Sequence, residues 1–167
     1  MPAGSSNTAG LPASLGALLE RAAELARSED AFESAEVDGG VLRVTPADCE
    51  HECDYRVEAV DGSLFAGWYT PDRYLSQSVE AELVYTGDDL DDLVDEELAD
   101  QPGWTLPTRL APFEHLRTES KVFTFRSRTP LGVDAGDSAA HAASLIAALV
   151  AYDLAVRQLG DMKPDDE

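Results

Sequence analysis

The chain opens with apolar residues at helical spacing. Between Leu11 and Ala26, leucines and alanines return every three or four positions, and charged residues fill the opposite side. Residues spaced in this way lie on one face of a helix, and a proline such as Pro12 is tolerated in the first turn. The pattern predicts an amphipathic helix that ends near Glu29 or Asp30.

Two pairs of short alternating segments follow, and each pair is joined by a turn signal. Asp38-Gly39-Gly40 separates the first pair, and Asp61-Gly62 separates the second. Asp-Gly between two alternating segments is typical of a β-hairpin, because the turn needs residues that tolerate positive φ. The predicted strands are Phe32 to Val37, Val41 to Pro46, Tyr55 to Val60 and Ser63 to Tyr69.

The second hairpin also predicts its own register. If Asp61 and Gly62 are the two loop residues, Val60 faces Ser63 and the pairs count outward from there. A register shifted by one residue would break the sorting of apolar side chains onto one face. The predicted register puts six such side chains together in three facing pairs: Ala59 with Leu64, Val57 with Ala66, and Tyr55 with Trp68.

The middle of the chain carries both kinds of pattern. Residues 78–86 alternate and predict a strand. An apolar stripe over 90–98 in an otherwise acidic segment predicts a helix that ends before Pro102. Residues 104–120 show no clean period, and an irregular segment of that length can hide short strands.

The last third predicts one strand and one long helix. Residues 121–128 alternate and predict the strand, and a turn region is expected over 129–136. Asp137 or Ser138 can cap a helix that runs to about Leu159. This helix is apolar around more of its circumference than a surface helix needs. Two interpretations stay open: the helix is central to the core, or it is half buried in a partner.

Together these elements predict an α+β fold. We expect an antiparallel meander sheet of five to six strands, with an N-terminal helix, a middle acidic helix and a C-terminal apolar helix that cover one face of the sheet. The length suits one domain. The expected organisation is a disordered tail over 1–10, a single domain over 11–160 and a disordered acidic tail over 161–167.

The charge adds an expectation about the surrounding solvent. The chain has 33 Asp and Glu against two lysines and ten arginines, which gives a formal net charge of −21. Self-repulsion of this size destabilises a compact state, but at about 1 M salt the screening length is only about 3 Å. The composition resembles that of haloarchaeal proteins, and we expect a halophilic, cytoplasmic protein. The alternative is an acidic protein with a charged interaction face.

Some classes of partner are disfavoured by the same composition. The arginines are scattered, so no basic patch for nucleic acid or an anionic membrane is expected. Residues 1–10 lack the basic region and apolar run of a secretion signal. The longest apolar stretch, Ala139 to Leu159, is interrupted by charged residues. We therefore expect direct binding to neither nucleic acid nor a membrane.

One short segment has the composition of a metal site. Cys49, His51 and Cys53 supply two thiols and an imidazole, which suit zinc. On an extended strand Cys49 and Cys53 would lie about 13 Å apart, so only a tight loop lets the three converge. The alternatives are a polar hairpin loop with two thiols and one histidine, or a redox disulfide between the two cysteines.

No catalytic signature stands out, and the leading hypothesis is a non-enzymatic binding or adaptor protein. The order of helices and strands resembles that of chaperone-like domains that cradle partner segments, such as type III secretion chaperones. A homodimer through the last helix is one form of this hypothesis. A small metal- or thiol-dependent regulatory protein that uses the Cys49, His51 and Cys53 cluster is the alternative. The candidates for partner contact are Trp68, Tyr69, Tyr74, Leu145, Leu149 and Tyr152.

Overall fold

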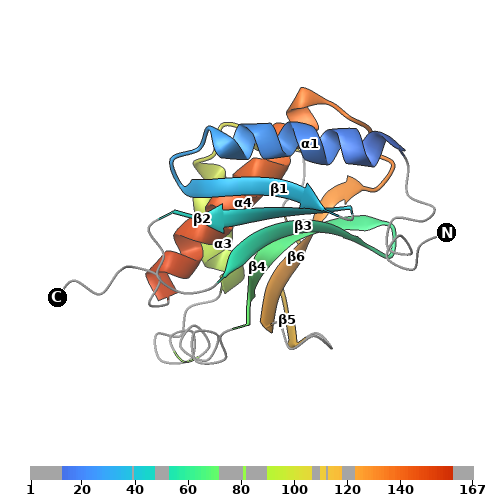
Figure 1. The fold of residues 1–167 in the computed structure, drawn as a ribbon. Coiled ribbons are helices and arrows are strands. Elements are labelled where there is room, and N and C mark those ends of the chain that lie inside the picture. Colours follow the sequence, from blue (N-terminus) through green and yellow to red (C-terminus); the bar gives the residue numbers. More distant parts are fainter. Residues whose placement is uncertain are drawn as a thin grey trace.

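A six-stranded antiparallel sheet carries a layer of helices on one face (Figure 1). The computed structural model describes residues 13–38, 40–47, 53–71, 81, 90–106, 110–111, 113–117 and 123–159. Within these residues the helices are α1 (Ala13–Arg27), α3 (Leu90–Ala99) and α4 (Ala139–Leu159). The predicted α+β class and the placing of the helices are confirmed.

The sheet is a meander only over its first four strands. The strand order is β1 (Phe32–Asp38), β2 (Val41–Pro46), β3 (Asp54–Val60), β4 (Ser63–Thr70), β6 (Phe123–Gly132) and β5 (Glu114–Arg117). After α3 the chain forms the outer strand β5 first and then returns to pair β6 with β4. β6 takes the inner place because its side chains at Thr124, Phe125 and Ser127 are buried, whereas Glu114 and His115 of β5 are exposed.

The register of the second hairpin is the predicted one. Val60 pairs with Ser63, Ala59 with Leu64, Val57 with Ala66 and Tyr55 with Trp68. Asp61 and Gly62 have φ values of 51° and 82°, as a two-residue turn that follows the twist of the strands requires. The strong local signal therefore fixed both the turn and the face that enters the core.

Two predictions about strands need correction. The strand predicted over 78–86 lies outside the described residues except for Ala81, which is helical, so the prediction is wrong there. The turn region predicted to begin at Thr129 is also wrong over 129–132, because β6 continues to Gly132. Inward-facing Thr129 and Leu131 extend the alternation past the exposed Pro130, and Thr129 Oγ1 donates a hydrogen bond to the Leu64 carbonyl at 2.8 Å. The irregular segment 104–120 does contain a short strand, β5.

α4 is the central helix of the core. It packs on β3 and β4, with α1 and α3 beside it (Figure 1). Ser138 Oγ accepts a hydrogen bond from the His141 backbone N–H at 3.0 Å, which confirms the predicted N-cap. Ala139–Arg157 has the length and composition of a membrane span, but 72% of it is buried inside the protein. The core interpretation of this helix therefore describes the structure.

A buried polar network ties α4 to the sheet. The Tyr55 hydroxyl donates to Asp153 Oδ1 at 3.0 Å, and Arg157 Nε donates to the same carboxylate at 2.9 Å. Arg157 Nη2 also donates to the Ala47 carbonyl at 2.6 Å. Burial raises the pKa of Asp153 against the opposing effects of Arg157 and Tyr55. The far half of α4 is thus held at β3 and at the end of β2.

The opposite face of the sheet carries charged side chains over aromatic rings. Arg56 lies over the Tyr69 ring, with its guanidinium carbon 4.5 Å from the centroid, and Arg126 lies 4.8 Å over Phe65. Arg56 also pairs with Asp54, and Arg126 pairs with Glu58 and Glu114. With Arg43 and Arg128, four of the ten arginines lie on this outer face of the sheet.

Candidate binding groove on the helical layer

The described residues that the sequence suggested for partner contact are buried. Trp68, Leu145, Leu149 and Tyr152 are fully buried, and Tyr69 is 2% exposed. Tyr74, the sixth candidate, lies outside the described residues. Trp68, Leu145, Leu149 and Tyr152 fill the interior, whereas Tyr69 is covered by Arg56 on the outer face of the sheet. Partner contact at the suggested residues stays a prediction.

The suggested metal cluster is described at one position. Cys53 is buried in the hydrophobic core at the start of β3. Cys49 and His51 lie outside the described residues. Within the described part of the chain, no three metal-ligating side chains gather. The zinc hypothesis and the thiol hypothesis therefore stay predictions.

An apolar groove of about 310 Å³ lies between α1, α4 and the turn after α3. Leu25 and Glu29 form the α1 wall, and Gln101, Pro102 and Gly103 form the turn wall. We call this the α1–α4 groove. Four apolar residues of α4 form its floor: Ala143, Ile146, Ala147 and Val150.

The α1 wall is fixed by contacts to the sheet. Arg27 donates two hydrogen bonds to the Ala35 carbonyl of β1, from Nε at 3.1 Å and from Nη2 at 2.8 Å. Phe32 N–H donates to the Glu29 carbonyl at 3.2 Å, so the chain turns from α1 into β1 within a few residues. Leu25 is therefore held at the rim of the groove, where 37% of it is exposed.

The turn wall is fixed to α4. Ser144 Oγ donates to the Gly103 carbonyl at 3.2 Å and accepts a bond from Thr105 N–H at 3.4 Å. A Cβ at Gly103 would lie 3.1 Å from the Ala143 carbonyl oxygen, so a larger residue would push the turn slightly away from α4. Both walls are thus positioned by hydrogen bonds to neighbouring elements, and the groove is formed in advance of any ligand.

The floor is the side of α4 that faces away from the sheet. Leu145, Leu149 and Tyr152 face the sheet and are fully buried. At about 3.6 residues per turn, Ala143, Ala147 and Val150 of the floor fall on the other side of the helix. Because α4 is apolar around its whole circumference, the sequence does not distinguish the side that faces the sheet from the side that lines the groove. Leu25, Ile146 and Val150 were missed as site residues for the same reason, since each fits an ordinary core position.

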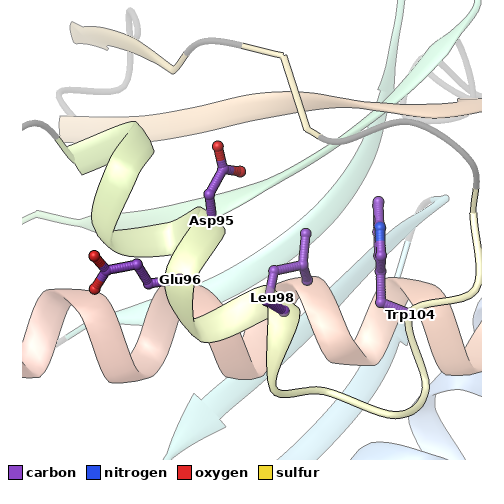
Figure 2. A pocket seen from close by; sticks show the side chains of 5 residues that line it. Asp95, Glu96, Leu98 and Trp104 are labelled. Atoms are coloured by element: carbon purple, nitrogen blue, oxygen red, sulfur yellow. The ribbon is translucent and has the colours of Figure 1, made fainter.

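A second hollow of about 320 Å³ lies between α3 and Trp104, the residue that follows this turn (Figure 2). Asp95, Glu96, Leu98 and Ala99 of α3 line it together with Trp104. Figure 2 shows Asp95, Leu98 and Trp104 projecting toward the same side, whereas Glu96 points away along the helix. We call this the Trp104 hollow. An indole ring near carboxylates is an environment that suits a cation.

The α1–α4 groove has the chemistry of a binding site. Its lining offers apolar carbons, one amide and one carboxylate, and no nucleophile paired with a base. Such a surface can hold apolar side chains, with Glu29 and Gln101 as polar contacts at the rim. No model of a known protein family matches the chain, and no curated protein or solved structure is significantly similar to it.

Proposed function

We propose that the chain is a non-enzymatic binding or adaptor domain, and that it takes an apolar helical segment of another protein in the α1–α4 groove. The observation that carries this proposal is a pre-formed apolar groove with an exposed leucine at its rim. Small side chains at Ala143 and Ala147 keep the floor of the groove low and leave room for the side chains of a bound segment. Laying an apolar face into such a groove is a recurring mode of peptide recognition.

The size of the groove sets what can enter it. A volume of about 310 Å³ lies at the lower end of ligand pockets, at about 300–1,000 Å³. It holds a few side chains at a time. An extended apolar protein surface is therefore a poorer match than one or two turns of a helix that present leucine-sized anchors.

Binding of a labelled helical peptide tests the proposal. A fluorescein-labelled peptide of about 16 residues, with a leucine face and no net charge, is long enough to form a helix. Fluorescence anisotropy in molar potassium chloride measures its affinity. We expect Leu25→Asp to weaken binding about tenfold, because burying a leucine side chain contributes about 1.5–3 kcal/mol.

Leu154 supplies the matched control. It is 36% exposed, against 37% for Leu25, but it does not line the groove. Leu154→Asp should therefore leave the affinity for the peptide unchanged. Its effect on the stability of the fold should be similar to that of Leu25→Asp. The proposal fails if the peptide does not bind, or if both variants lose affinity equally.

Self-association through α4 is the other occupant that the groove could have. Two copies that each carry a formal charge of −21 repel one another, most strongly at low salt, and this repulsion favours a separate protein as the occupant. Light scattering along a dilution series in molar potassium chloride distinguishes the two. A mass that rises with concentration, and that Leu25→Asp holds at the monomer value, would replace the separate partner with a second copy.

A further inference from the structure

The α1–α4 groove carries negative charge that no described residue neutralises. Glu29 lines the groove and makes no ion pair within the described part of the chain. Asp100 is exposed beside Gln101 of the turn wall and is likewise without an ion pair there. The two arginines of α1 are engaged elsewhere. Arg21 pairs with Asp137 at 2.7 Å, and Arg27 binds the Ala35 carbonyl.

The residues that follow the C-termini of two helices line the groove. α1 ends at Arg27, next to the Glu29 wall, and α3 ends at Ala99, next to the Gln101–Gly103 wall. Each C-terminus carries the negative end of a helix dipole, where a cation is favoured. α3 has no basic residue in its last turn. A basic side chain from outside α3 can therefore interact with the C-terminal end of the helix dipole.

The Trp104 hollow adds a second place for a cation at the same end. Trp104 of the hollow follows the Gln101–Gly103 wall of the groove directly in the sequence. The hollow offers an indole ring, together with the Asp95 carboxylate of α3. A cation over an aromatic face is attracted by the ring and by nearby carboxylates. A long basic side chain whose backbone lies over the turn can reach into it.

From these observations we propose that the segment bound in the α1–α4 groove carries lysine or arginine next to its apolar side chains, at the end that lies over the Gln101–Gly103 turn. The inference rests on the proposed function and names the partner: an amphipathic helix with a basic end. The apolar side chains enter the groove. The basic side chain lies between Glu29, the two helix C-termini and the Trp104 hollow.

The charge distribution of the chain favours this occupant over a second copy. Four arginines lie on the outer face of the sheet, on the side away from the helices. α3 contributes five carboxylates and no basic residue to the helical layer. A second copy would bring the same acidic helical layer to the groove, whereas a basic helix brings complementary charge.

Three peptides with one apolar face test the inference. They end in a cluster of lysines, glutamines or glutamates, and each is made with the cluster at either end of the helix. Affinity measured by anisotropy should fall from lysine to glutamine to glutamate, by about two- to fivefold per step, as expected for exposed ion pairs. Lower salt should widen the difference, because screening weakens.

Two variants locate the effect in the protein. Glu29→Gln should reduce the preference for the lysine peptide, measured as the ratio of its affinity to that of the glutamine peptide. Glu33→Gln changes the net charge equally at an exposed position on β1, away from the groove, and should leave this ratio unchanged. Iodide quenching of tryptophan fluorescence reports on Trp104, because Trp68, the other tryptophan of the chain, is fully buried. Peptides without aromatic residues should protect Trp104 from iodide quenching only when they carry lysine.

The outcomes separate this inference from the function on which it rests. If the three peptides bind equally, and Leu25→Asp still weakens all of them, the basic end is wrong and the groove remains a binding site. If Glu33→Gln acts as strongly as Glu29→Gln, overall charge explains the preference and the inference falls. If none of the peptides binds, the proposed function and the inference fail together.

Discussion

At the scale of single residues, Gly67 leaves less room for a Cβ than the other glycines that the structure describes. It lies on β4 opposite Arg56 on one side and Arg126 on the other. A Cβ at this position would overlap the Phe125 carbonyl oxygen and the Cα of Arg126. Both are backbone atoms of β6, and they can move only with the strand itself. The glycine therefore allows β4 and β6 to approach, and lets the arginines meet their carboxylates above it.

Gly67→Ala should accordingly destabilise the fold, by about 1–3 kcal/mol or more. Denaturant unfolding in molar potassium chloride measures the change. Gly16→Ala is the control, because Gly16 lies in α1 with nothing within 4 Å of a Cβ. That substitution should stabilise the protein by about 0.5–1 kcal/mol through helix propensity. Equal effects at the two positions would contradict the packing argument.

Asp153 predicts a specific dependence of stability on pH. Burial raises the pKa of Asp153 in the folded state above its ordinary value, despite Arg157 and Tyr55. A raised pKa means that ionisation costs more in the folded chain than in the unfolded one. The stabilising contribution is therefore complete below the unfolded pKa of about 3.9 and is lost as the pH rises through the folded value.

Comparison with Asp153→Asn isolates this residue from the other 32 acidic side chains. The free energy of unfolding of both proteins is measured between about pH 7 and pH 4, a range that ends near the unfolded pKa. As the pH falls, the free energy of unfolding of the wild type should rise relative to that of the variant. If the wild type instead becomes less stable relative to the variant on acidification, the ion pair with Arg157 has a larger effect on the pKa of Asp153 than burial has.

At the scale of elements, α4 depends on its first turn. Ser138 caps the helix through the hydrogen bond from His141 N–H, and Asp137 beside it pairs with Arg21 of α1. Ser138→Ala should cost about 1 kcal/mol of stability, the usual value of an N-cap. Ser138→Asp keeps an acceptor at the same position and should retain most of it. Thermal unfolding of the two variants measures the difference.

The elements that the sequence predicted well are those with local signals. Asp61-Gly62 and the alternation on both sides of it are enough to set the register of β3 and β4. The position of β6 between β4 and β5 has no local signal in the sequence, because it depends on which of the two strands buries more side chains in the folded sheet. The extension of β6 to Gly132 was hidden by Pro130, which is exposed on the strand.

The groove could not be predicted because its residues come from three separate segments. Leu25, Pro102 and Val150 meet only through the packing of α1 and the turn on α4. In the sequence each has the pattern of an ordinary core or turn residue. The aromatic residues Trp68 and Tyr152 were more conspicuous, and they are the ones that the core takes up.

At the scale of the whole molecule, net charge should make stability depend on salt. The formal charge of −21 means that the acidic side chains repel one another, and this repulsion is strongest when counterions are few. Dialysis from molar potassium chloride to about 0.1 M lengthens the screening distance from about 3 Å to about 10 Å. We expect a lower unfolding temperature after dialysis, measured by circular dichroism. An unchanged temperature would contradict the expectation of a halophilic protein.

The two outer strands of the sheet have a consequence for the protein at high concentration. β1 carries Glu33, Glu36 and Asp38, and its pairing with β2 is irregular between Phe32 and Ser34. At the other margin, β5 has only four residues. Charged, irregular or very short edge strands are poor templates for strand addition. A crowded solution of the folded protein should therefore stay free of fibrils.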